Sequence, residues 1–496
     1  MEMPKVMINR TTAILLLLKL FFVPYLFAQE GRQVEPAKWE KEYPRAPSPV
    51  NTAGWGKHIQ RTMTLLATST PEKRNTVRIL FYGQSITANK KWTDAVVADL
   101  IDRFPYANII YENRAIGGFA SQYLVNSSES DMYPFYPDLV IFHVYGAHKE
   151  YQEIIHTLRS RTTSEVAIVS DHLGANEYDG KEFLSPGDWN NFMRKTFVPA
   201  VAKEYRAQLI DITTPWKEYL QKNNLTSQAL LSDGIHPNDH GCFLMSELVK
   251  RELVYLPDHP KDEWKGLVKE YKIGKDVKFE KGKLTFEFEG NRVDVVAGNG
   301  DNPVALDVKI DGKKPSEIKS CYAFTRTSGS PGVEWPAILR IDSETLPLIE
   351  NWKLTVEQVN EPNTDFTFKV EGSKTGFDGT GNSFEKFISN SGRVVIEPGM
   401  WKNLQRDYEF KGKPVTPGFE ITWSVKPLFV DQYQPVEMTD PLKEYATLLA
   451  QNLTNEKHKL ELTIKGKGQP LIKAIRIYTP PVKGPMKLVA SPPVNQ

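Results

Sequence analysis

Between Val77 and Leu256 the chain repeats one pattern, a short apolar run followed by an amphipathic segment, and this pattern restricts the fold more than any other feature. The apolar runs are nearly continuous, as in strands that are covered on both faces. They lie at 77–83, 107–113, 138–146, 165–171 and 206–212. Helical spacing occurs at 91–104, 148–160, 188–205 and 239–254. The order predicts an α/β domain with a parallel sheet between helices, in which ligands bind beyond the carboxyl ends of the strands.

After Pro257 the pattern changes to alternating polar and apolar residues, which is typical of antiparallel sheets. The expected strands are 278–298, 304–313, 352–359, 365–372, 393–398 and 458–466. We expect them to form a β-sandwich at 262–484, with an insertion near 370–425 and one helix at 439–451. The last strands, within 458–481, resemble those of galactose-binding-like jelly rolls.

The amino terminus has the features of an export signal. A positively charged start is followed by an apolar run that ends at Ala28, after small and apolar residues suited to cleavage. The alternative, a membrane anchor, is disfavoured because Lys19 and Pro24 interrupt a run that is already short. We therefore predict a signal at 1–28, an extension with one helix at 29–75, the α/β domain at 76–258, and a secreted or periplasmic protein without stable membrane insertion.

Charge and cysteine content exclude several classes of protein. Lys and Arg number 62 against 61 Asp and Glu in 496 residues, and this balance argues against a nucleic-acid-binding protein. The two cysteines, Cys242 and Cys321, are too few for a disulfide scaffold or a multi-cysteine zinc site, and we expect both to be buried free thiols.

Three short motifs follow expected strands. Ser85 lies in Gly83-Gln84-Ser85, on the turn after the first strand, where its hydroxyl is exposed as a nucleophile requires. Asp233 and His236 are three residues apart, so the carboxylate can orient the ring and leave the other ring nitrogen as a general base. The paired glycines that end at Gly118 can bring a backbone N–H close to a developing oxyanion. Each motif alone is more often an ordinary loop, turn or helix cap.

Taken together and in this order, the motifs resemble those of the SGNH (GDSL-type) hydrolase superfamily, over about 77–256. The resemblance implies a three-layer, flavodoxin-like α/β/α domain and ester hydrolysis through an acyl-enzyme. It assigns Ser85, Asp233 and His236 to catalysis, and the backbone of Ser85 and Gly118 to the oxyanion hole. It implies no metal and no other cofactor.

Two positions depart from the family pattern. Gln84 replaces the usual Asp beside the nucleophile, and His148 stands where the family has the oxyanion-hole Asn. His148 either donates an N–H in place of that amide, or marks an altered or lost activity, or caps the following helix. We expect Gln84, Arg114 and His172 to contact substrate.

We therefore predict a secreted serine esterase that removes an acyl group, most simply acetyl, from an acylated oligo- or polysaccharide. The alternatives are a non-hydrolytic glycan-binding protein on a degenerate SGNH fold, and a glycosidase or acyl transferase that uses the same site. The acyl group, the sugar and the oligomeric state are left open by the sequence. The tryptophans of the β region either belong to its core or form a sugar-stacking surface, and we expect the core for all four: Trp335, Trp352, Trp401 and Trp423.

Overall fold

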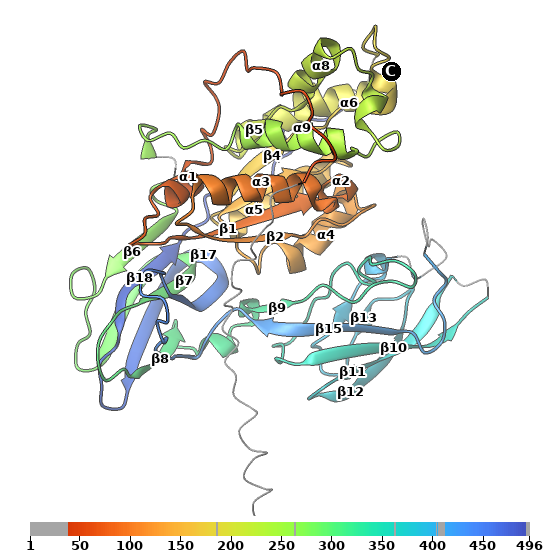
Figure 1. Ribbon diagram of the computed structural model, residues 1–496. Helices are drawn as coiled ribbons and strands as arrows, with labels where there is room; N and C mark the ends of the chain where they lie inside the picture. Colours follow the sequence, from red (N-terminus) through yellow and green to blue (C-terminus); the bar gives the residue numbers. More distant parts are fainter. Residues whose placement is uncertain are drawn as a thin grey trace, which may run out of the picture.

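The computed structural model describes residues 38–184, 187–261, 264–361, 364–402, 404 and 412–492. The predicted export signal lies outside these residues. Figure 1 shows an α/β domain above two antiparallel β lobes that lie side by side. In the described part of the chain, no helix has the length and apolar character needed to cross a bilayer.

The α/β domain is built on a five-stranded parallel sheet in the order β2-β1-β3-β4-β5, which is the flavodoxin-like order. Its strands are β1 (Thr76–Gly83), β2 (Asn108–Asn113), β3 (Leu139–His143), β4 (Glu165–Val169) and β5 (Gln208–Ile210). The side chains of β1 alternate between two cores: Val77, Ile79 and Phe81 face one, and Leu80 and Tyr82 face the other. A strand buried on both faces has this near-continuous apolar sequence.

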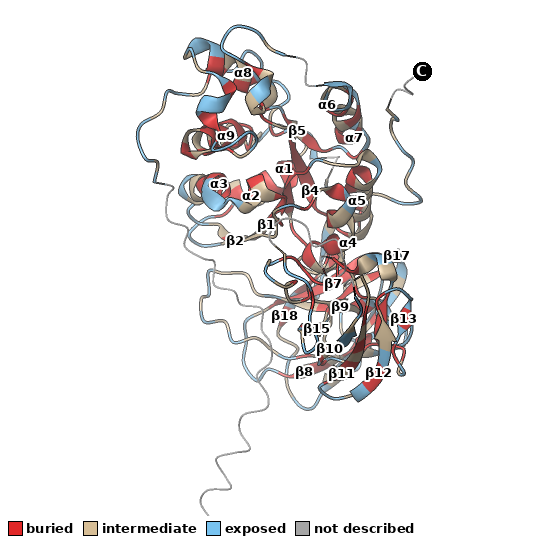
Figure 2. Ribbon diagram, turned by 90° about the vertical axis from the view of Figure 1, so that its right-hand side faces the viewer, coloured by how far each residue is buried: buried red, intermediate tan, exposed pale blue. Residues whose placement is uncertain are grey.

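Helices cover both faces of the sheet, as Figure 2 shows by the buried strands between them. One face carries α1 (Gln60–Ala67), α3 (Lys90–Arg103), α8 (Thr213–Lys222) and α9 (Asp239–Lys250). The other carries α4 (Ser121–Asp131), α5 (His148–Arg161), α6 (Gly187–Phe192) and α7 (Val198–Glu204). A π-helical turn, Met193–Phe197, joins α6 to α7 within the single helix expected at 188–205. The predicted α/β architecture is confirmed.

The β region contains two larger antiparallel sheets. The six-stranded sheet, ordered β16-β8-β17-β7-β18-β6, consists of β6 (Val268–Lys272), β7 (Lys283–Ala297), β8 (Ala305–Ile310), β16 (Gln432–Tyr433), β17 (Ala446–Lys465) and β18 (Ile472–Tyr478). The five-stranded sheet, ordered β12-β11-β10-β15-β9, consists of β9 (Tyr322–Phe324), β10 (Asn351–Val359), β11 (Phe366–Gly372), β12 (Gly376–Asn382) and β15 (Glu420–Pro427). A short pair, β13 (Phe387–Ile388) and β14 (Val395–Ile396), lies beside it. Each larger sheet has its own hydrophobic core. The antiparallel sheets confirm the expected fold class.

Three local predictions need correction or addition. The helix expected at 439–451 is wrong: β17 begins at Ala446 and pairs with β7, so partner strands override the local helical spacing. The stretch expected as an insertion, 370–425, supplies β12 and β15, which pair within the five-stranded sheet. Helices α4 and α8 were not predicted, and α4 buries serines and an aspartate rather than an apolar stripe.

The β region and the α/β domain share part of a core. Trp335 and Leu339, from the chain between β9 and β10, belong to the same buried cluster as the α4 and α5 side of the parallel sheet. All four tryptophans expected in the core are buried, as are Cys242 and Cys321, which are free thiols.

Candidate active site

Ser85 lies at the carboxyl end of β1, where the chain turns into the short helix α2 (Ser85–Ala88). The turn passes so close to β3 that a Cβ on Gly83 would lie 2.2 Å from the carbonyl oxygen of His143 and 2.6 Å from Thr87 Oγ1. Only glycine fits this close approach. The turn leaves Ser85 half-buried at the edge of the sheet where ligands are expected.

The second motif forms a tight turn before α9. The two ends of the turn are joined by a hydrogen bond, in which the amide of Ser232 donates to the carbonyl of His236 at 2.8 Å. Inside the turn, Asp233 Oδ1 accepts the backbone N–H groups of Ile235 at 2.7 Å and His236 at 2.8 Å. The Asp233 carboxylate thus shapes the loop that carries His236.

The two motifs meet through one imidazole ring. Asp233 Oδ2 lies 2.7 Å from His236 Nδ1, and Ser85 Oγ lies 2.8 Å from His236 Nε2. The hydrogen bonds from His236, first from its backbone and then from its ring, lower the pKa of Asp233 to about 2, and the carboxyl is therefore ionised at neutral pH. An ionised Asp233 assigns the proton to Nδ1 and leaves the Nε2 lone pair facing the Ser85 hydroxyl, which is the arrangement of a general base and its nucleophile.

The paired glycines border the nucleophile. The amide of Ile116 donates to the carbonyl of Gly83 at 3.0 Å, which ties this loop to the turn after β1. A Cβ on Gly117 would lie 3.8 Å from Ser85 Cβ, in ordinary contact. Gly118 has a φ of +79°, a conformation that favours glycine. Gly117 thus lies beside Ser85, and the part of the Gly118 N–H in an oxyanion hole stays a prediction.

These observations agree with the predicted fold. The sheet order, the position of Ser85 after β1 and the convergence with Asp233 and His236 are those that the resemblance implies. The α/β domain has the SGNH hydrolase fold.

Comparisons with solved structures find two esterases and a GDSL-like lipase. A two-domain esterase active on acetylated mannans, co-crystallised with mannopentaose, is 13% identical, with 86% of this chain and 98% of that chain covered and a TM-score of 0.34. The acetylxylan esterase Axe2 from Geobacillus stearothermophilus is 19% identical, with coverage of 38% and 98% and a TM-score of 0.31. A GDSL-like lipase from Parabacteroides merdae is 18% identical, with coverage of 36% and 96% and a TM-score of 0.31. No protein-family profile matches the chain. No curated protein matches it either.

His172 supports the turn that carries His236. Its Nε2 donates to the carbonyl of Ile235 at 2.7 Å, and the amide of Ala175 donates to the carbonyl of Gly234 at 3.0 Å. Burial lowers the pKa of His172 to about 4, so the ring is neutral and its single proton serves this bond. The geometry favours a supporting role over the substrate contact expected from the sequence.

Gln84 is also buried rather than open to substrate. When its amide is oriented to match its neighbours, the nitrogen donates to the carbonyl of His143 and the oxygen accepts the N–H of Tyr145, both at 3.3 Å. It therefore links the turn after β1 to the end of β3. Arg114, the third expected substrate contact, is partly exposed and pairs with Glu112.

His148, at the position of the SGNH oxyanion Asn, is the first residue of α5. Its ring makes edge-to-face contacts with Trp189, Phe192 and Phe197, with ring centroids 5.6, 5.8 and 5.4 Å away. This aromatic surrounding accounts for the orientation of the ring. A part for His148 in the oxyanion hole stays a prediction.

Two sets of residues near the site were not predicted. The residues Tyr145 and Trp189 are 43% and 42% exposed; Tyr145 follows β3, and Trp189 lies in α6. Trp335, from the β region, contacts the loop at 114–120 between β2 and α4, which we call the glycine loop. The Nε1 of Trp335 donates to the carbonyl of Gly117 at 2.6 Å. No sequence signal links Trp335 to Gly117, because they are 218 positions apart and lie in different domains.

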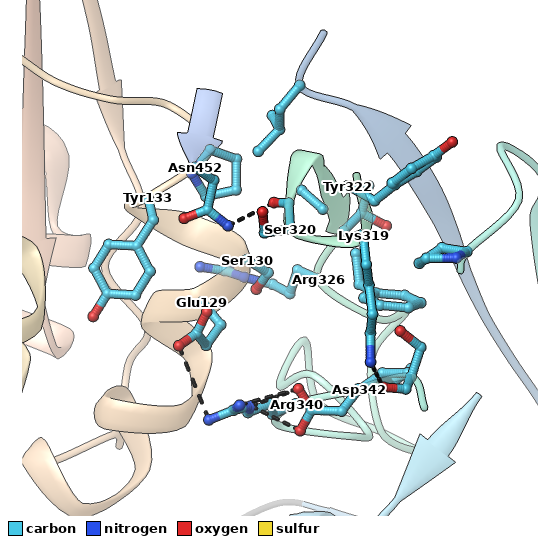
Figure 3. A pocket seen from close by; sticks show the side chains of 18 of the residues that line it. Glu129, Ser130, Tyr133, Lys319, Ser320, Tyr322, Arg326, Arg340, Asp342 and Asn452 are labelled. Carbon is cyan, nitrogen blue, oxygen red and sulfur yellow. Dashed lines mark hydrogen bonds and ion pairs between the residues drawn. The ribbon is translucent and has the colours of Figure 1, made fainter. Parts of the chain in front are cut away.

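A cavity of about 580 Å³ lies between α4 and the β region, away from the catalytic side chains (Figure 3). Several polar groups in its lining have partners: Arg340 pairs with Asp342 and Glu129, and the Asn452 amide donates to the carbonyl of Ser320. Ser85, Asp233 and His236 do not line it. Across the described ranges, no group of three or more His, Cys, Asp or Glu side chains is placed to hold a metal ion.

Proposed function

We propose that this protein is a serine esterase. The observation that carries the proposal is the hydrogen-bonded chain from Ser85 Oγ through His236 to Asp233. The hydroxyl of Ser85 attacks the ester carbonyl carbon while His236 Nε2 takes its proton. His236 then gives that proton to the departing alcohol, and the acyl group stays on Ser85.

Deacylation uses the same groups in reverse. His236 takes a proton from a water molecule, whose oxygen attacks the acyl carbon, and the carboxylic acid leaves as the proton returns to Ser85. The N–H groups of Ser85 and Gly118 stabilise the oxyanion in both steps. Asp233 holds the ring in one tautomer and stabilises the imidazolium that forms.

We propose an acylated carbohydrate, with acetyl as the simplest acyl group, as the substrate. Tyr145 and Trp189 support a ring-shaped ligand, because large exposed aromatic rings offer flat apolar faces beside polar groups. Export of the protein, inferred from residues 1–28, would bring it to extracellular or periplasmic glycans. The β lobes agree with this proposal, because such β domains often accompany secreted enzymes that act on carbohydrates.

The direct test is acetate release from acetylated oligosaccharides, with p-nitrophenyl acetate as a simple ester. The wild-type protein should turn over and Ser85→Ala should lose at least about a thousandfold in rate. Ser48→Ala, which changes an exposed serine in the segment before α1, is the control and should keep most of the activity. A Ser85→Ala protein as active as the parent would refute the nucleophile.

The packing of His148 favours one second candidate, a glycan-binding protein without turnover. An aromatic enclosure around the ring does not supply the amide donor that SGNH enzymes carry at this position. Glycan binding that survives Ser85→Ala, with no hydrolysis of any ester tested, would support this candidate over the esterase.

A further inference from the structure

The β region contacts the glycine loop of the active site at two carbonyl groups. Trp335 Nε1 donates to the carbonyl of Gly117 at 2.6 Å, and Arg326 Nη2 donates to the carbonyl of Arg114 at 2.9 Å. Both donors come from the chain between β9 and β10, and both acceptors lie in the short loop between β2 and α4. The loop beside Ser85 is therefore held from outside its own domain.

The Trp335 ring is also packed against the loop. A Cβ on Gly118 would lie 2.6 Å from Trp335 Cζ2, so the ring occupies the space that a side chain there would need. The ring centroid lies 5.5 Å from that of Phe119, and Trp335 is only 8% exposed. The ring thus lies under the loop and is buried, rather than open to a ligand.

The guanidinium of Arg326 that contacts the loop is also held by an ion pair. It pairs with Asp131, the last residue of α4, at 2.7 and 3.0 Å, and the Asp131 side chain is fully buried. A bidentate pair of this kind restricts the guanidinium to one orientation. Figure 3 shows Arg326 between α4 and the β region.

The hydrogen bond from Trp335 to the Gly117 carbonyl also fixes the direction of the Gly118 N–H, because both groups belong to one peptide unit. The carbonyl of Gly117 and the N–H of Gly118 belong to the same planar peptide, and in a trans peptide they point in opposite directions. A donor that holds the Gly117 oxygen on the Trp335 side therefore aims the Gly118 N–H away from Trp335. The same bond polarises the peptide and strengthens the N–H as a donor.

We infer that Trp335 is a positioning residue, which orients the Gly117–Gly118 peptide so that its N–H can stabilise the oxyanion formed at Ser85. The effect on turnover rests on the proposed esterase function, whereas the bracing of the loop does not. The β region is thus part of the catalytic apparatus as well as an appended module.

The test replaces Trp335 and a matched tryptophan in the full-length protein. Trp335→Phe removes the indole N–H and keeps an aromatic ring. Trp401→Phe is the control, because Trp401 is also 8% exposed, lies in the β region, and has an indole nitrogen without a hydrogen-bond partner among the described residues. Amide hydrogen exchange of residues 114–120 measures the bracing, and kcat and KM on p-nitrophenyl acetate measure its effect.

In Trp335→Phe we expect faster exchange in the loop and a kcat lower by about tenfold to a hundredfold, because small misplacements of catalytic groups have effects of that size. KM should change little, since the oxyanion forms only in the transition state. Trp401→Phe should match the wild type in both measurements. If Trp335→Phe does not fold, benzothienylalanine at 335 keeps the ring shape and replaces the N–H with sulfur.

Loop exchange that is unchanged, or that rises equally in the two variants, would overturn the inference. A wild-type protein without esterase activity would refute the proposed function instead, and the exchange measurement would still decide whether Trp335 braces the loop. A fall in kcat without faster exchange would also contradict bracing.

Discussion

At the scale of single residues, one carboxylate has two tasks. Asp233 Oδ1 holds the turn by accepting two backbone N–H groups, and Oδ2 accepts the His236 ring. Each oxygen can serve its own partners because an ionised carboxylate has lone pairs on both. The short Asp-x-x-His spacing is thus a requirement of the turn as much as of the chemistry.

Asp233→Asn should preserve the turn but lower the catalytic rate. The amide can still accept the backbone bonds, but it no longer supports the tautomer and the imidazolium, and kcat should fall by about 10³- to 10⁴-fold. Kinetics on p-nitrophenyl acetate measure this. Asp211→Asn is the control, because Asp211 accepts the amides of Thr213 and Thr214 in a similar turn without a histidine. Equal losses in the two variants would contradict the role of Asp233.

Two buried histidines should make stability depend on pH. Burial lowers the pKa of both His143 and His172 to about 4, whereas in the unfolded chain a histidine titrates near 6.5. Between these values the unfolded state binds more protons, so stability is complete above about pH 6.5 and falls as the pH drops towards 4. The slope should be about 1.4 kcal/mol per pH unit for each histidine.

Urea unfolding at pH 7, 6, 5 and 4.5 measures this slope. In His172→Gln the amide can still donate to the carbonyl of Ile235 but does not titrate, and the slope should decrease by one histidine's share. A slope that is the same in the variant and the wild type would show that His172 is not a buried neutral group.

At the scale of elements, the helices and strands whose own residues carry a clear apolar pattern were predicted correctly. Those that depend on distant partners were missed or assigned wrongly. Strands such as β1, buried on both faces, and helix α3, with its apolar stripe, carry their pattern in their own residues. The first residues of β17 have helical spacing, and only pairing with β7 makes them a strand. Helix α4 was missed because the residues it buries include Ser127, Ser128 and Asp131, and the partner of Asp131 lies far away in the chain.

Gly83→Ala should disrupt the junction between β1 and α2. The added methyl would collide with the carbonyl of His143, a backbone atom that cannot rotate away, and unfolding should become easier by roughly 3 kcal/mol. Chemical denaturation measures the change. Gly234→Ala is the control within the same site, because nothing lies within 4 Å of the place that its Cβ would take, and it should stay within about 0.5 kcal/mol of the wild type. A tolerated Gly83→Ala would contradict the close approach of β1 and β3.

At the scale of the whole molecule, the β region and the α/β domain are joined by buried polar contacts as well as by apolar packing. Arg326 and Asp131 form an ion pair across the boundary, and Gln451 donates to the carbonyl of Tyr133. Tyr136 donates to Asn291, again from one domain to the other. These contacts hold the β region in one place on α4, which is the arrangement that the Trp335 contact requires.

Arg326→Met should destabilise the protein by roughly 3 kcal/mol, because it leaves the buried Asp131 carboxylate without its partner. Asp131→Asn combined with Arg326→Met should recover part of this loss, since no buried charge remains. Unfolding in urea measures both. Lys353→Met, which breaks an exposed pair with Glu420, should cost less than about 1 kcal/mol. A loss in Arg326→Met no larger than in Lys353→Met would contradict a buried pair at the boundary.

The sequence by itself determined the alternation of buried strands and helices, the parallel sheet it implies, and the order of the three motifs at the carboxyl ends of the strands. These follow from local periodicity and from turn residues, which act over a few positions. Tertiary structure alone decided that His172 and Gln84 support the site from within, that His148 lies among aromatic rings, and that Trp335 reaches the glycine loop. Those roles depend on contacts between segments far apart in the chain, and such contacts leave no period or spacing in a single sequence.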